Sequence, residues 1–109
     1  VGSGRVRVLA TQVMINLIEA ATLEALDRLL PAGYQSLGTR LDVRHIAATP
    51  VGMRVRAAVK VLKVEGRTVF FEVEAHDERE LIGDGHHERV VVNVEKFDQR
   101  VARKHVSDK

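Results

Sequence analysis

Hydrophobic positions in the first third of the chain recur with the spacing of an α-helix. Between Thr11 and Leu30, apolar residues lie three or four positions apart, as in a helix that packs one face on a protein core. Thr11 is the predicted N-cap, and Pro31 and Gly33 are predicted to end the helix. The apolar arc is wide, so we expect the helix to be mostly buried. Its members are Met14, Ile15, Ile18, Ala21, Leu23, Ala25, Leu26, Leu29 and Leu30.

The rest of the chain alternates apolar and polar residues, which is the period of a half-buried β-strand. Four such runs follow the helix, over residues 37–47, 53–64, 68–76 and 81–97. A shorter strand is predicted at residues 5–8, ahead of the helix. Glu65 and Gly66 predict a tight hairpin, and Gly83 and Gly85 predict bulges in the last strand. This order of elements predicts an α+β domain in which one long helix packs on an antiparallel sheet.

Length and composition describe one ordinary globular domain. The chain has 109 residues, which we take as a single domain over residues 1–109. Hydrophobic residues make up 45% and charged residues 29%, and no run of 18 apolar residues predicts a membrane span. The absence of cysteine excludes disulfides, thiolate zinc sites and cysteine nucleophiles.

The excess of positive charge is confined to the C-terminal end. From Lys96 onward there are five basic and two acidic residues, whereas residues 1–95 carry 12 basic and 13 acidic ones. Residues 98–109 are therefore predicted as a basic tail, and the body of the domain gives no sign of nucleic-acid binding. The chain begins with Val1, which indicates a fragment or a processed form. No secretory signal is visible, so we expect a cytoplasmic protein.

Two residues on apolar faces could carry chemistry. Glu19 interrupts the apolar arc of the helix, either as a residue that reaches water at its edge or as a desolvated carboxylate suited to general-base or nucleophilic work. His45 shares a predicted strand face with Leu41 and Val43, either as a core histidine with one hydrogen bond or as a catalytic group. The pattern by itself leaves both alternatives open.

The segment from Gly83 to Arg89 gathers two glycines, two histidines and charged groups. His86 and His87 are adjacent, so on a strand their side chains point to opposite faces and do not readily share a metal ion. The planar guanidinium of Arg89 could bind a carboxylate or phosphate, or pair with an acidic neighbour. We therefore predict no metal and no other cofactor.

Several motifs resemble a known family when they are taken in order along the chain. The most specific is His45-Ile46-Ala47-Ala48-Thr49-Pro50, preceded by Leu9-Ala10-Thr11, Leu17-Ile18-Glu19-Ala20-Ala21 and Ser36-Leu37-Gly38-Thr39. Ala75-His76-Asp77 and His87-Glu88-Arg89 continue the match. Over residues 9–104 the chain resembles the hot-dog-fold thioesterases of the fluoroacetyl-CoA thioesterase type.

The resemblance implies a fold, an activity and site residues. The fold is a long helix wrapped by an antiparallel sheet, and the activity is hydrolysis of a small or short-chain acyl thioester of CoA or an acyl carrier protein. Thr11, Glu19 and His45 match the family's catalytic residues. Gly38 matches the glycine whose backbone N–H meets the acyl oxygen, and Arg89 matches the arginine near the acyl product. The family also implies a homodimer, or a dimer of dimers, with sites at the subunit boundary.

Three other functions fit parts of the same pattern. They are a hot-dog module that binds acyl-CoA without turnover, a hot-dog dehydratase or hydratase acting on acyl thioesters, and a nucleic-acid binder that uses the basic tail. Thiol release, a change in enoyl absorbance and salt-dependent DNA binding would distinguish them.

Overall fold

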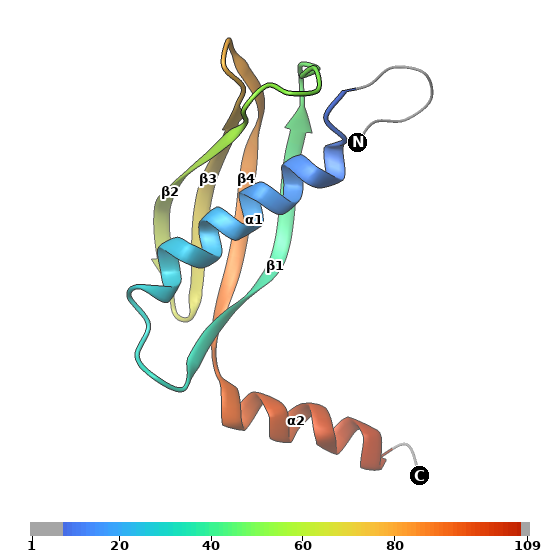
Figure 1. Ribbon diagram of the computed structural model, residues 1–109. Coiled ribbons are helices and arrows are strands. Elements are labelled where there is room, and N and C mark those ends of the chain that lie inside the picture. Colours follow the sequence, from blue (N-terminus) through green and yellow to red (C-terminus); the bar gives the residue numbers. More distant parts are fainter. Residues whose placement is uncertain (1–7, 108–109) are drawn as a thin grey trace.

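The computed structural model describes residues 8–107, which form two helices and one four-stranded antiparallel sheet (Figure 1). The elements are α1 (Thr11–Asp27), β1 (Tyr34–His45), β2 (Arg56–Glu65), β3 (Thr68–His76), β4 (Leu81–Asn93) and α2 (Val94–Ser107). The strand order across the sheet is β1-β4-β3-β2, so β1 and β2 are its edges. The predicted α+β architecture is confirmed.

Helix α1 crosses one face of the sheet diagonally and buries a single stripe against it (Figure 1). The buried residues of α1 recur every four positions, at Met14, Ile18, Thr22 and Leu26. Met14, Ile18 and Leu26 form the core with the sheet residues Val69, Phe71, Val73, Ala75 and Ile82. The predicted arc was too wide, because one sheet face covers only one side of a helix. Leu23 is 40% exposed, and Leu29 lies beyond the end of α1 and is 77% exposed.

The start of α1 differs from the prediction by one residue. Ala10 is the N-cap, it makes no side-chain capping bond, and Thr11 is the first helical residue. The hydroxyl of Thr11 instead contacts the imidazole of His45. The predicted capping role of Thr11 is therefore wrong. Residues 5–7 of the predicted first strand lie outside the described residues, and Val8 forms an isolated antiparallel bridge with Pro50.

Glycine is required at positions 83 and 85 of β4 for different structural reasons. The pairing of β3 with β4 shifts next to Gly83, as a bulge requires, and a Cβ there would lie 2.8 Å from the Arg44 carbonyl oxygen. Gly85 stays in register with both neighbouring strands, so the bulge predicted there is wrong. A Cβ on Gly85 would overlap the carbonyl oxygen of Asp42, which explains the need for glycine.

The predicted last strand is too long, because it ends at Asn93 and continues as helix α2. The side-chain oxygen of Asn93 accepts a hydrogen bond from the backbone N–H of Lys96 at 3.0 Å, which is the geometry of an N-cap. The residues predicted as a basic tail thus belong to α2 as far as Ser107, and α2 projects away from the sheet (Figure 1). Neither described helix is long and apolar enough to cross a membrane.

Candidate active site

The first group of candidate residues lies where α1 begins and β1 ends. Thr11 Oγ1 lies 2.9 Å from His45 Nδ1, although 34 residues separate the two in the chain. The other ring nitrogen of His45, Nε2, is buried and has no hydrogen-bond partner, alone among the buried side-chain nitrogens and oxygens that the structure describes. A buried polar atom without a partner is unusual and is often functional. His45 is therefore hydrogen-bonded through Nδ1, whereas Nε2 is free to bond to a substrate or a water molecule.

A hollow of about 410 Å³ opens beside this pair. Its walls are Val8, Leu9, Ala10, Thr11, His45, Ile46, Ala47 and Ala48. The backbone around it is fixed by the His45-to-Pro50 motif. The Leu9 N–H donates to the Thr49 carbonyl at 2.9 Å, and the buried Thr49 hydroxyl donates to Asp77 at 3.0 Å. Thr49 thereby aligns the segment before α1 with the segment after β1.

The second group lies two turns further along α1, on the same face of the sheet. The half-buried side chain of Glu19 and the buried side chains of His87 and Arg89 of β4 all lie around Gly38 of β1. A Cβ on Gly38 would lie 3.1 Å from His87 Cε1, 3.5 Å from Glu19 Oε2 and 3.6 Å from Arg89 Nη1. Three polar side chains thus converge on the one residue that has no side chain of its own. The ladder between β1 and β4 is also interrupted directly after Gly38.

The guanidinium of Arg89 is the dominant charge of this second group. Arg89 is 6% exposed, and burial lowers the pKa of its guanidinium, while the negative charges of Glu19 and Asp27 oppose that shift. An arginine keeps its proton across the physiological range, so a buried cation faces Glu19. Such a cation suits a bound carboxylate or a developing oxyanion.

The two groups are too far apart to act together on one small carbonyl within one chain. Thr11 and Glu19 both lie on the regular helix α1, so eight residues place them about 12 Å apart along its axis. Within one chain, the predicted set of Thr11, Glu19 and His45 is therefore divided between the two groups. Gly38 and Arg89 lie with Glu19 in the second group.

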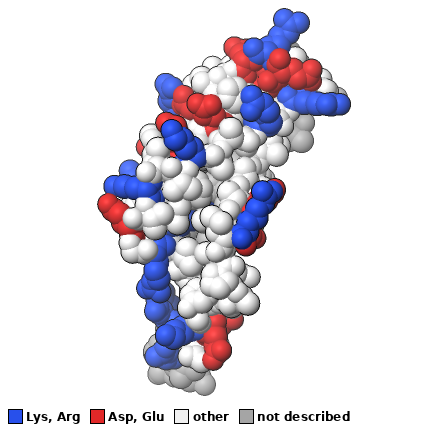
Figure 2. Space-filling model, turned by 90° about the vertical axis from the view of Figure 1, so that its left-hand side faces the viewer, with Lys and Arg blue, Asp and Glu red and all other residues white. Residues whose placement is uncertain are grey.

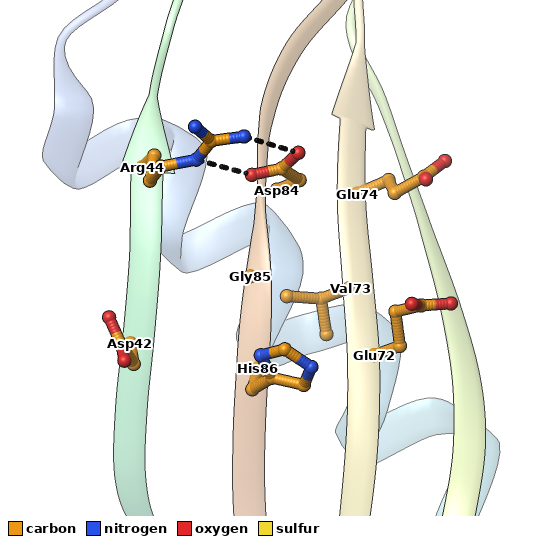
Figure 3. A pocket seen from close by; sticks show the side chains of 8 residues that line it. All are labelled: Asp42, Arg44, Glu72, Val73, Glu74, Asp84, Gly85 and His86. Atoms are coloured by element: carbon orange, nitrogen blue, oxygen red, sulfur yellow. Dashed lines mark hydrogen bonds and ion pairs between the residues drawn. The ribbon is translucent and has the colours of Figure 1, made fainter.

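The two adjacent histidines of β4 lie on opposite faces of the sheet, as predicted. His87 is buried on the α1 side, whereas His86 lines a hollow of about 370 Å³ on the other side (Figure 3). In that hollow Arg44 and Asp84 form an ion pair at 2.9 Å, which raises the pKa of Arg44 and lowers that of Asp84. Among residues 8–107, no three His, Asp or Glu side chains are grouped closely enough to hold a metal ion.

Sequence reasoning missed two residues of the second group. From the sequence, His87 is considered as a metal ligand and as part of the His87-Glu88-Arg89 motif, and Ser36 only as part of a motif, so neither is named as a site residue. Both are buried and both contact Arg89. The available signal was the alternation on β4, which puts His87 on the same face as Arg89.

Comparison with known proteins identifies the family. A family model described as fluoroacetyl-CoA-specific thioesterase matches residues 1–95. A fluoroacetyl-CoA thioesterase from Streptantibioticus cattleyicolor is 43% identical over 97 residues, which cover 89% of this chain and 70% of that relative.

Solved structures agree with this match. A fluoroacetyl-CoA-specific thioesterase variant, in complex with fluoroacetate and CoA, superposes with a TM-score of 0.82 at 43% identity, covering 89% of this chain and 76% of that one. A hot-dog-like protein from Thermanaerovibrio acidaminovorans gives a TM-score of 0.85 at 31% identity, and the match covers 90% of this chain and 73% of that one. The predicted hot-dog fold is thus confirmed, and the chain belongs to the fluoroacetyl-CoA-specific thioesterase family.

Proposed function

We propose that the protein hydrolyses a small or short-chain acyl-CoA to a carboxylate and free CoA. The observation that carries the proposal is the convergence of Glu19 and the buried Arg89 on Gly38. A carboxylate that can attack or activate water stands there beside a cation that can hold a carboxylate product. The relative that binds fluoroacetate and CoA supports the same class of substrate.

Glu19 acts on the thioester carbonyl in one of two ways. As a general base, it takes a proton from water while the water oxygen attacks the carbonyl carbon, and the carbonyl π electrons move to the oxygen. As a nucleophile, it forms the new C–O bond itself and gives a mixed anhydride, which water then hydrolyses. In both cases the C–S bond breaks, its electron pair leaves with sulfur, and the thiolate takes up a proton.

The remaining candidates stabilise charge or supply protons. The backbone N–H of Gly38 and the guanidinium of Arg89 face the developing oxyanion and the carboxylate product. His45, oriented by Thr11 through its Nδ1, uses Nε2 to protonate the leaving sulfur or to orient water. Losing one oxyanion donor typically costs about 2.7–4 kcal/mol in the barrier.

A homodimer would bring the two groups together. Each subunit has Thr11 and His45 at one end of α1 and Glu19 near its middle, so a second subunit can bring its Glu19 to the first subunit's His45. The edge strand β2 supports such pairing, because Val61 and Val64 are opposite the buried Phe71 and Val69 yet are 46% and 60% exposed. Figure 2, viewed from the side of β2, shows an uncharged strip between charged residues.

A panel of acyl-CoAs of increasing chain length, including fluoroacetyl-CoA, tests the function. We expect release of free thiol, with the highest kcat/KM for short acyl groups. Tight binding without thiol release would identify a non-catalytic acyl-CoA module. A change in enoyl absorbance without thiol release would identify a dehydratase or hydratase. Turnover only with an acyl carrier protein thioester would change the carrier and keep the reaction.

A further inference from the structure

The guanidinium of Arg89 is held on three sides by buried groups. Its Nε donates to Ser36 Oγ at 2.8 Å, and its Nη2 donates to the Ser36 carbonyl oxygen at 3.0 Å. Its Nη1 lies 3.3 Å from His87 Nε2. A guanidinium has five N–H groups, so one remains on Nη1 and one on Nη2, and Nη1 is the nitrogen that lies near Gly38.

The two contacts of His87 determine where its proton lies. Arg89 can only donate hydrogen bonds, so His87 Nε2 must accept and carries no proton. On the other side of the ring, His87 Nδ1 lies 2.8 Å from the carbonyl oxygen of Arg40, which can only accept. The imidazole is therefore neutral, with its proton on Nδ1.

We propose that His87 is a positioning residue, a neutral imidazole that orients the Arg89 guanidinium toward the acyl group. The inference rests on the proposed function, in which Arg89 meets the acyl oxygen or the carboxylate product. Ser36 fixes one side of the guanidinium plane and His87 fixes the Nη1 corner, the corner nearest to Gly38. A planar cation held in this way loses little conformational freedom when it binds a carboxylate.

This role explains why the buried residue at this position is a histidine and why its ring lies against Gly38, neither of which packing alone requires. His87 is 1% exposed, and a histidine in that position needs partners for both nitrogens, whereas an aliphatic side chain would need none. Both nitrogens are engaged, so neither has a lone pair left for a metal ion. His87 Cε1 also lies against Gly38, so the ring is seated in the site itself.

Three substitutions of His87 separate positioning from packing. The amide of His87→Gln can reach the Nε2 position and accept from Arg89, that of His87→Asn can reach only the Nδ1 position, and His87→Leu fills the volume without polar atoms. Each variant is compared with the parent by thermal melting, by kcat and KM for a short acyl-CoA, and by the inhibition constant of the carboxylate product. Arg89→Met provides the reference for complete loss of the cation.

We expect His87→Leu and His87→Asn to raise the product inhibition constant and lower kcat/KM by about tenfold or more, because a hydrogen bond to a charged group is lost. We expect His87→Gln to stay within about threefold of the parent in both quantities. If His87→Leu does not fold, the comparison of Asn with Gln decides the question.

The outcomes distinguish the inference from the proposed function. If Arg89→Met hydrolyses acyl-CoA and binds product like the parent, Arg89 has no role and the proposed site fails with the inference. If Arg89→Met is impaired but His87→Leu or His87→Asn matches the parent, only the positioning role is overturned. Equal impairment of the Gln, Asn and Leu variants would also overturn it, because packing would then explain the effect.

Discussion

Thr11 Oγ1 and His45 Nδ1 lie 2.9 Å apart and join the first residue of α1 to the last residue of β1. The Thr11 hydroxyl therefore contacts an imidazole from another element, while the N-cap residue Ala10 makes no side-chain cap. It also leaves His45 Nε2 as a buried nitrogen without a partner in the described part of the chain. A helix start that has no side-chain cap and orients an imidazole is typical of a functional site.

The first prediction concerns this pair. His45→Ala is expected to lower kcat by about 100-fold or more, the range of a lost acid–base group. Thr11→Val, which keeps the shape but loses the hydroxyl, should reduce activity, whereas Thr11→Ser should retain it. Thiol release measures activity, and thermal melting checks the fold. Turnover of His45→Ala near the parental rate would make His45 a core residue only.

The second prediction concerns Glu19. Glu19→Gln keeps the shape of the side chain but removes the base and nucleophile, so we expect a loss of about 100-fold or more in kcat with an unchanged melting temperature. Glu24→Gln is the matched control, because Glu24 lies on the same helix, exposed and paired with Arg28. Activity of Glu19→Gln close to that of Glu24→Gln would contradict the assignment.

The third prediction is that the working unit is at least a dimer. Sedimentation at low micromolar concentration should give at least twice the chain mass of 12.1 kDa. Val64→Lys on β2 should shift the protein toward monomer and lower activity. Val51→Lys is the control, because Val51 is 63% exposed, close to the 60% of Val64, and lies outside the strands. A fully active monomer would reject the shared site.

Fourth, a chelator should leave activity unchanged. No group of three potential ligands occurs in the described residues, and both nitrogens of His87 are already engaged. Thiol release is measured before and after treatment with excess chelator and dialysis. Loss of activity that zinc or manganese restores would show a metal dependence and direct attention to His86.

The fifth prediction concerns the stability contributed by Asp77. The backbone N–H groups of Arg79 and Glu80 donate to its carboxylate and lower the pKa of Asp77, and the Thr49 hydroxyl adds to this. Because the folded pKa lies below the unfolded one, near 3.9 for an ordinary aspartate, this stability is present above that pH and is lost as the pH falls through the folded pKa.

The variant Asp77→Asn should therefore be less stable than the parent at pH 6. Urea unfolding at pH 6 and at pH 3 measures the difference in the free energy of unfolding between the two proteins. We expect that difference to be smaller at pH 3. A difference that does not change with pH would show that the charge of Asp77 contributes nothing.

The sequence alone predicts those elements that depend only on the spacing of neighbouring residues. Alternation gave strand β3 without error, and Gly66 gave the hairpin turn before it, because side-chain period and turn conformation are properties of a few neighbouring residues. The same reasoning failed at Asn93, where alternation continued into a helix that starts with an asparagine cap. The resemblance to thioester hydrolases was confirmed by the family match.

The tertiary structure alone decided which of these residues meet. Thr11 and Glu19 are near in sequence, yet about two turns of α1 separate them. Thr11 and His45 are distant in sequence, yet their side chains are hydrogen-bonded. Arg89 meets Ser36 only because β1 pairs with β4, and neither strand by itself specifies the register of that pairing. Local period fixes the face on which a side chain lies, but only the packing of α1 on a paired sheet brings charges and hydrogen-bond partners together.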